Sequence, residues 1–186
     1  MPIVINGSGT VTGLSVGGVN DGAIAHADLA TSTQPIFPSY AIIDEQQAHD
    51  THAGTFTQDA WQTRLLNTEV ADPDSIVSIS SNQFTLQAGT YLLKWSAPAR
   101  NVSHNQTRVY NITDSAVVRY GSSEYSATAD AQTRSTGSAR VTIGGAKAFE
   151  LQHYCRSTSA HHGFGCAANS DGATEHYSIV EIYKEA

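Results

Sequence analysis

Charged residues are scarce in this 186-residue chain, in which Asp, Glu, Lys and Arg together make up 15%. Soluble domains usually carry about 25% of these residues. The basic residues are the fewest, because ten Lys and Arg stand against seventeen Asp and Glu and give a formal net charge of −7. Nucleic-acid binding needs Lys and Arg clustered along a surface. Since the basic residues are scattered and form no run, the sequence excludes a nucleic-acid partner.

Long hydrophobic runs are also absent. No apolar segment approaches the roughly 20 residues that a membrane-spanning helix needs, so we expect no membrane insertion. Residues 1–7 contain no basic residue and no long apolar region, and they do not have the pattern of a secretory signal peptide. We expect such a protein to reach the outside of a cell by a route other than ordinary secretion, such as the release of virions by lysis.

Cysteine is rare as well, with only Cys155 and Cys166 in the chain. Two cysteines are too few for a disulfide scaffold or a zinc site. If the segment between them forms a hairpin with its tip near Ala160 and His161, the two thiols lie across from each other. A disulfide there would stabilise the fold by about 3 kcal/mol, whereas folding in a reducing cytosol favours two free thiols. Both predictions stay open at this point.

Signatures of catalysis are missing. The sequence contains no Gly-x-Ser-x-Gly nucleophile motif and no glycine-rich phosphate loop that precedes a helix. Asp72 and Asp74 flank Pro73 in a turn, whereas a glycosidase needs two carboxylates that face each other across a groove. We therefore expect no enzymatic activity, no catalytic residues and no cofactor.

Histidines form two clusters in the sequence. His49 and His52 lie beside Asp50, and such side chains bind metals in other proteins, but the surrounding sequence offers no third or fourth ligand. A polar loop without a metal is therefore the prediction. His161 and His162 are adjacent near the expected hairpin tip. They form a candidate receptor-binding loop, with a plain exposed loop as the alternative.

From residue 56 onward, apolar and polar residues alternate with the period of β-strands. Tyr91, Leu93 and Trp95 share one face of a candidate strand, and the last strand alternates in the same way. Strands separated by turn residues recur about every 8–15 residues, which is typical of β-sandwiches and barrels. No sustained helical period appears in this part of the chain. The sequence therefore predicts an all-β antiparallel domain over residues 56–186.

Residues 1–55 have a different composition, with six glycines among the first 22 residues. Each glycine in an extended segment adds about 0.5–1 kcal/mol to the cost of ordering it, and so short a segment buries too little apolar surface to offset that cost. We predict an anchoring arm that orders only against a partner, followed by a linker over residues 31–55 with a candidate strand at 40–43. The residues expected to contact the partner are Ile3, Ile5, Val11, Leu14, Val16, Val19, Ile24 and Leu29.

Two segments resemble the tumour-necrosis-factor-like jelly rolls of phage fibres. Residues 86–99 have the sequence Leu-Gln-Ala-Gly-Thr-Tyr-Leu-Leu-Lys-Trp-Ser-Ala-Pro-Ala, and residues 177–184 form a closing strand of aromatic and aliphatic residues. Residues 5–30 resemble the opening of phage tail-fibre and virion-associated proteins. The resemblance implies an antiparallel jelly-roll sandwich that forms a homotrimer around a three-fold axis, and an arm that docks on the virion. The residues it assigns to the core and trimer strands are Tyr91, Leu93, Trp95, Tyr177, Ile179 and Tyr183.

The resemblance also implies a role as a non-enzymatic phage protein of the virion surface, made in the bacterial host cytoplasm. One expectation is a capsid decoration or cement protein whose arm binds the major capsid protein. The alternative is a short tail or head fibre, whose arm binds tail or portal proteins and whose jelly roll binds a host surface glycan or protein. A carbohydrate-binding module is a second alternative. The chain has no shaft repeat, coiled-coil heptad or collagen-like triplet, which favours decoration.

Overall fold

The computed structural model describes residues 36–128 and 130–186. Within these ranges all regular secondary structure is β-strand, and no helix there is long and apolar enough to cross a membrane. The strands are β1 (Ser39–Gln47), β2 (Gln62–Thr63), β3 (Thr68–Ala71), β4 (Val77–Ser80), β5 (Gln83–Leu86), β6 (Gly89–Arg100), β7 (Ser103–Asn111), β8 (Ala116–Ser126), β9 (Gln132–Ile143), β10 (Lys147–Cys155) and β11 (Glu175–Lys184).

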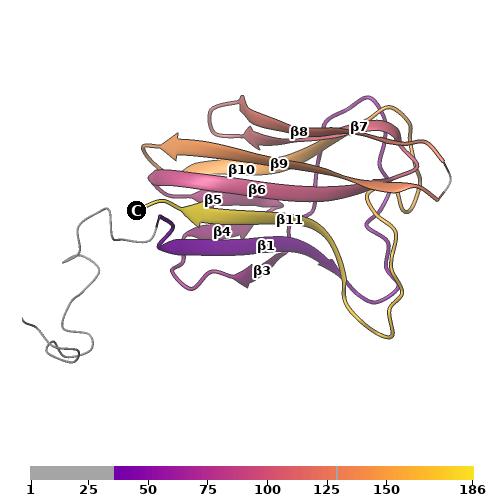
Figure 1. Cartoon of the computed structure of the whole chain (residues 1–186), viewed down its shortest axis with the longest axis horizontal. Coiled ribbons are helices and arrows are strands. Elements are labelled where there is room, and N and C mark those ends of the chain that lie inside the picture. The colour runs from indigo at the N-terminus through magenta and orange to yellow at the C-terminus, as the bar shows by residue number, and fades with distance from the viewer. Residues whose placement is uncertain (1–35, 129) are drawn as a thin grey trace, which may run out of the picture. The chain divides into compact units, whose positions relative to one another are not determined.

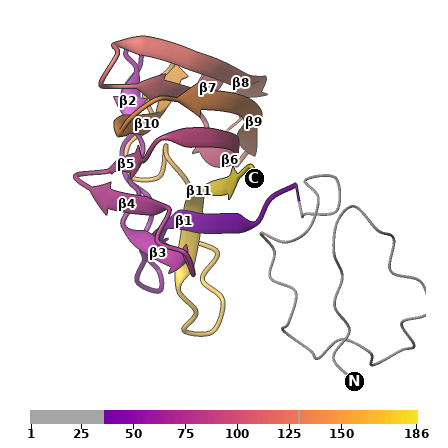
Figure 2. The ribbon, with the colours of Figure 1, turned by 90° about the vertical axis from the view of Figure 1, so that its left-hand side faces the viewer.

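The strands form two antiparallel sheets, one packed on the other (Figures 1 and 2). The first sheet has the order β3-β1-β11-β6-β9, and the second has the order β4-β5-β10-β7-β8, with β2 also pairing to β10. Sheet neighbours are often far apart in the sequence, since β1 pairs with β11 and β6 pairs with β9. Double sheets with such crossing connections are jelly rolls. The predicted all-β antiparallel jelly-roll sandwich is confirmed.

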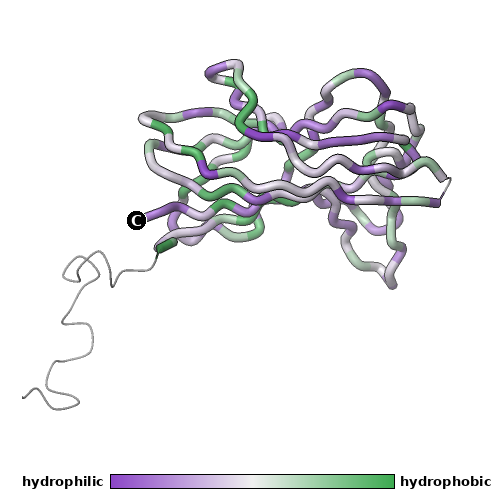
Figure 3. Tube along the Cα trace, turned by 45° about the horizontal axis from the view of Figure 1, so that its top comes forward, coloured by the Kyte–Doolittle hydropathy of each residue, from purple (hydrophilic) through white to green (hydrophobic). Residues whose placement is uncertain are grey.

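Alternation along the strands fills the space between the sheets. In β6 the side chains of Tyr91, Leu93 and Ala97 are fully buried, whereas Lys94 is exposed. Full burial of a large apolar side chain contributes about 1.5–3 kcal/mol. The most hydrophobic stretches lie in the half of the sandwich that holds the C-terminus (Figure 3). The main core cluster includes Ile43, Phe84, Leu86, Tyr91, Leu93, Trp95, Phe149, Leu151, Val180 and Ile182.

Trp95 joins the two sheets at the centre of the core. Its indole Nε1 donates a 2.9 Å hydrogen bond to Oγ1 of Thr107 on β7, so the polar atom of the buried ring has a partner. The ring lies against Gly137 on β9, where a β-carbon would be 2.1 Å from the ring atom Cζ2. The position opposite Trp95 therefore has to be glycine.

The sandwich begins earlier in the chain than the sequence predicted. The linker was expected to reach residue 55, yet the candidate strand at 40–43 lies inside β1, which pairs with both β11 and β3. Ala41 and Ile43 are buried in the core. The predicted boundary is wrong because a short apolar cluster between polar residues reveals its burial only when the partner strands are known. The compact unit starts at Ile36.

Of the two arrangements that the sequence left open, the structure has the free thiols, since Cys155 and Cys166 are not bonded to each other. Residues 159–165 do not fold back on β10 as the expected hairpin would. Their backbone instead pairs with residues 53–56, through bonds such as Phe56 N to Ser159 O at 3.0 Å and Ala53 N to Gly165 O at 3.0 Å. Burial raises the pKa of the Cys155 thiol to about 11, so this thiol stays protonated at neutral pH.

Candidate interaction surface

The outer face of the first sheet carries apolar side chains at the end where β1 begins and β11 ends. Ile36 is 74% exposed, Tyr40 45% and Phe37 38%. Register places Tyr40 opposite Tyr183, and Tyr183 opposite Leu92, and the rings of Phe37 and Tyr183 are 5.6 Å apart. We call these five residues the apolar end patch. Contiguous exposed apolar residues are uncommon on the surfaces of monomeric proteins and often mark interaction surfaces.

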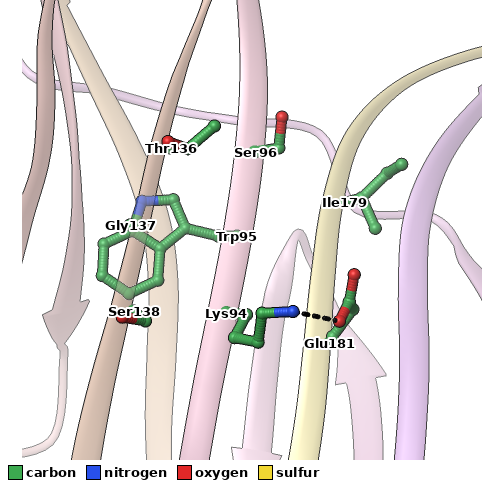
Figure 4. A pocket seen from close by; sticks show the side chains of 8 residues that line it. All are labelled: Lys94, Trp95, Ser96, Thr136, Gly137, Ser138, Ile179 and Glu181. Carbon is green, nitrogen blue, oxygen red and sulfur yellow. Dashed lines mark hydrogen bonds and ion pairs between the residues drawn. The ribbon is translucent and has the colours of Figure 1, made fainter.

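A shallow hollow of about 390 Å³ continues from the patch toward the middle of the same face (Figure 4). Lys94 and Glu181 cross it as an ion pair of 3.2 Å, with Lys94 on β6 and Glu181 on β11. The Tyr183 hydroxyl donates a 2.8 Å hydrogen bond to the same carboxylate. The residues that line the hollow are Lys94, Trp95, Ser96, Thr136, Gly137, Ser138, Ile179 and Glu181.

The electrostatics of this face keep its charges fixed. Hydrogen bonds from Tyr183 and Lys94 lower the pKa of the Glu181 carboxyl, so it is ionised at neutral pH. Arg134 on β9 donates to Ser96 Oγ at 2.7 Å and to the carbonyl of Tyr177. A face with an apolar end and paired charges in its middle suits contact with another protein surface, because interfaces combine an apolar core with a satisfied polar rim.

The structure divides the six residues predicted for the core and trimer strands. Tyr91, Leu93 and Trp95 lie inside the sandwich and serve the core. Ile179 and Tyr183 alternate with buried Val180 and Ile182 and lie on the outer face of β11. Tyr177 is also on that face, but the loops cover it, and its hydroxyl donates a 2.7 Å hydrogen bond to Thr51 O.

The two predicted histidine clusters meet at the opposite end of the sandwich. The rings of His52 and His162 are 5.8 Å apart at an edge-to-face angle, and His52 Nδ1 accepts a 2.9 Å hydrogen bond from the backbone N–H of Ala167. His161 is exposed, and its backbone N–H donates to Thr55 Oγ1. Among the described residues, no group of three or more His, Cys, Asp or Glu side chains is placed to hold a metal. The predicted arm contacts from Ile3 to Leu29 lie outside the described residues.

Sequence reasoning missed a buried polar cluster beneath the loops of this end. Arg64 is fully buried, and its guanidinium forms a 3.2 Å ion pair with Glu45. It also donates hydrogen bonds of 2.7 Å to Ser178 Oγ and of 2.8 Å to Phe164 O. The guanidinium carbon lies 4.3 Å from the centroid of the Phe164 ring. Burial lowers the pKa of Arg64 to about 10, so it remains charged at neutral pH. With the carbonyl of Pro98 as a further acceptor, its partners come from four distant segments, and no local pattern signals such a position.

The sandwich of this chain superposes on solved structures of other proteins. Eiger TNF from S. frugiperda superposes with a TM-score of 0.52 at 13% identity, and the match covers 79% of this chain and 92% of that one. Murine APRIL at pH 5.0 gives a TM-score of 0.51 at 8% identity, with 78% and 98% covered. The sandwich has a TNF-like jelly-roll fold. No protein-family model matches the chain, and no curated protein matches its sequence.

The TNF-like fold was predicted from two sequence segments, and that prediction is confirmed. Residues 86–99 run from the end of β5 through most of β6, and residues 177–184 form most of β11. The two segments are neighbours in the first sheet, with register from Ile179 opposite Ser96 to Lys184 opposite Tyr91. The candidate interaction surface of the TNF-like sandwich is thus built on the same strands that carry the resemblance.

Proposed function

We propose that the chain is a non-enzymatic phage virion protein that assembles as a homotrimer through the outer face of its first sheet. The observation that carries this proposal is the apolar end patch, in which Ile36, Phe37 and Tyr40 expose large apolar side chains beside the end of β11. Burying such side chains against another protein surface is favourable by about 25 cal/mol per Å².

The size of the face suits a stable interface. Four of the five strands have 9 to 12 residues and β3 has 4; at about 3.3 Å per residue and about 4.8 Å between strands, the face measures roughly 20 by 30 Å. A standard interface buries about 800 Å² of accessible surface on each partner. Because side chains project from the sheet, the accessible surface of this face is larger than its flat area and is of that order. The trimeric order is supported by the resemblance of residues 86–99 and 177–184 to TNF-like modules that trimerise around a three-fold axis.

The virion role is supported by the N-terminal sequence. Residues 5–30 resemble the opening of phage tail-fibre and virion-associated proteins, and their glycine content favours ordering against a partner. We propose that this arm binds the major capsid protein and that the sandwich decorates or cements the shell. A short fibre, whose arm binds tail or portal proteins, is the second candidate, supported by the same resemblance.

The oligomeric proposal is tested by light scattering on the purified chain. We expect a mass three times the 19.8 kDa of one chain, and a fall toward the monomer mass in the double variant Tyr40→Glu and Leu92→Glu. Tyr125→Glu is the matched control, because this exposed tyrosine lies on β8 of the second sheet. A monomer mass for the unaltered chain refutes the trimer.

The virion proposal is tested by counting copies in purified particles with quantitative mass spectrometry. Hundreds of copies support decoration, and a few to a few dozen support a fibre. Deletion of residues 1–30 should release the sandwich from particles while leaving its oligomeric mass unchanged. Absence of the unaltered protein from virions refutes the virion role.

A further inference from the structure

A second hollow, of about 370 Å³, lies on the outer face of the second sheet. Register places Tyr154 of β10 beside Gln106 of β7, and Gln106 beside Ser123 of β8, so one row of side chains crosses three strands. The residues that line the hollow are His104, Asn105, Gln106, Ser123, Glu124, Tyr154 and Arg156. The hollow is on the layer of the sandwich opposite the apolar end patch.

Aromatic rings flank the hollow on two sides. On one side Trp61 packs against Tyr154 at 5.5 Å and against Tyr120 at 5.8 Å. On the other side Tyr125 packs edge-to-face on His104 at 4.8 Å. Tyr120 is 49% exposed and Tyr125 59% exposed, and neither belongs to the core. Exposed tyrosines around a polar hollow offer flat apolar faces to a ligand, and each carries a hydroxyl that forms hydrogen bonds.

The polar groups of the hollow are held in place before any ligand arrives. The Tyr154 hydroxyl donates a hydrogen bond of 2.9 Å to Asp59 Oδ1, and Arg156 donates one of 3.3 Å to the Tyr154 hydroxyl. Glu124 accepts a 2.7 Å hydrogen bond from Ser122, and Gln106 Nε2 donates 2.9 Å to Gly121 O. Such fixed groups lower the entropy that binding costs, because few rotamers have to be frozen.

The arginines beside the hollow are already held by partners within the protein. Arg156 lies 3.4 Å from Asp59, and Arg108, next to the aromatic side, donates to Gln152 while its guanidinium lies 4.1 Å over the Trp61 ring. A nucleic acid or an acidic polymer needs unpaired cations. These arginines are already engaged by acceptors and rings, so the hollow favours a ligand without net charge.

We propose that this hollow binds a neutral oligosaccharide. A sugar ring has one apolar face of C–H groups that packs on an aromatic ring, and a rim of hydroxyls that need both donors and acceptors. Trp61, Tyr154 and Tyr125 supply the rings, and the Gln106 carbonyl and Ser123 hydroxyl, which register places side by side, supply polar atoms between them. Binding sites of small molecules combine apolar walls with a few convergent polar groups in this way. One protomer contains the whole site, so the proposal does not depend on the trimer or on the virion role.

Tryptophan fluorescence gives a direct readout, because the chain has two tryptophans and only one of them is near the hollow. Trp95 is buried in the core with its Nε1 bonded to Thr107, whereas Trp61 borders the site. The probes are tetra- to hexasaccharides of glucose, galactose, mannose and N-acetylglucosamine, with oligogalacturonate as the acidic comparison. We expect one or more neutral probes to change the emission of the full chain, and Trp61→Phe to remove that change.

Affinity is then compared among variants by calorimetric titration with the neutral probe that gives the largest signal. Tyr154→Ala should weaken binding about tenfold, the equivalent of one lost aromatic contact, while Tyr154→Phe should weaken it less because the ring remains. Trp61→Ala provides a second test if Tyr154→Ala fails to fold. Val70→Ala, an exposed apolar residue on β3 outside both the hollow and the apolar end patch, should leave affinity unchanged.

Three results would overturn the proposal. The first is that no neutral probe binds at millimolar concentration. The second is that binding is equally strong in Tyr154→Ala, Trp61→Ala and Val70→Ala, which places the sugar elsewhere. The third is binding of oligogalacturonate alone, which contradicts the charge argument. None of these results affects the mass or copy-number tests of the proposed function.

Discussion

The two ends of the sandwich are stabilised by different chemistry. The end that holds the C-terminus packs large apolar side chains, such as Phe84, Leu93 and Phe149, between the sheets. The opposite end encloses Arg64, Glu45 and His153, with only a small apolar cluster around Phe56. Apolar packing tolerates changes that keep volume, whereas a buried ion pair requires specific partners. We infer that the polar end fixes the conformation of the loops that meet there.

The largest expected effect is the loss of the buried cation. Arg64→Met should lower the free energy of unfolding by about 3–5 kcal/mol, because it leaves the Glu45 carboxylate buried without its partner. Arg64→Lys should also be destabilising, since an ammonium cannot reproduce the contacts of the guanidinium with Ser178 and Phe164. Chemical denaturation measures both changes.

The double variant Arg64→Met and Glu45→Leu is the matched control. Replacing both members of a buried pair by apolar residues is often neutral, so the double variant should recover most of the lost stability. If the double variant is as unstable as Arg64→Met alone, the ion pair is not what makes Arg64 necessary.

At the apolar end the expected loss is somewhat smaller and depends on volume alone. Leu93→Ala should cost about 2–5 kcal/mol through lost burial and a cavity, and Leu93→Met less than about 1.5 kcal/mol. Leu93 is fully buried in β6, so both changes act on the core. The contrast between a tolerated Leu93→Met and an untolerated Arg64→Lys tests the comparison of the two ends. Equal losses in these two variants would contradict it.

The pH dependence of stability should come in part from the polar end. Burial, with Arg64 nearby, holds the pKa of His153 well below its usual 6.5. The unfolded chain therefore binds more protons as the pH falls, so the contribution of His153 is complete above about pH 6.5 and is lost below it, by at most about 1.4 kcal/mol per pH unit. Glu45 acts in the opposite direction, because burial raises its pKa.

The effect of His153 is isolated by comparing two variants across pH 5–8. His153→Gln should flatten the fall in stability below pH 6.5, while the amide can still donate to Asn105 Oδ1, as the histidine Nε2 does at 3.0 Å. His104→Gln, which replaces an exposed histidine, is the comparison variant. An unchanged profile in His153→Gln would show that His153 does not titrate in this range.

The same contrast explains what could be predicted from the sequence. β6 and β11 were predicted because each alternates along its own length, which is a local signal. β2, by contrast, covers only Gln62–Thr63, which is too short to show a period. The inward position of Arg64 depends on groups 19 to 114 residues away, and a lone arginine in a polar segment is usually on the surface.

Little in the sequence indicated the apolar end patch and the second hollow, because their residues are brought together by strand pairing. The resemblance to TNF-like modules assigned Tyr183 to the trimer contact, which stays a prediction, whereas Ile36 and Phe37 precede β1 and have no strand periodicity of their own. The second hollow joins Trp61 with Tyr120 and Tyr154. Three aromatic residues so far apart become a site only through the pairing of β10 with β7 and of β7 with β8.

The smallest expected effect is at a surface ion pair near the apolar end. Lys147 Nζ lies 2.5 Å from Asp114 Oδ1, and the two side chains are 27% and 45% exposed. Water already solvates these charges, so Lys147→Ala should change the free energy of unfolding by less than about 1 kcal/mol. Asp114→Ala should cost more, because Asp114 also accepts a 2.9 Å hydrogen bond from Asn111 Nδ2. A loss in Lys147→Ala as large as that in Arg64→Met would mean that burial does not separate the two pairs, and the distinction between the two ends would fail.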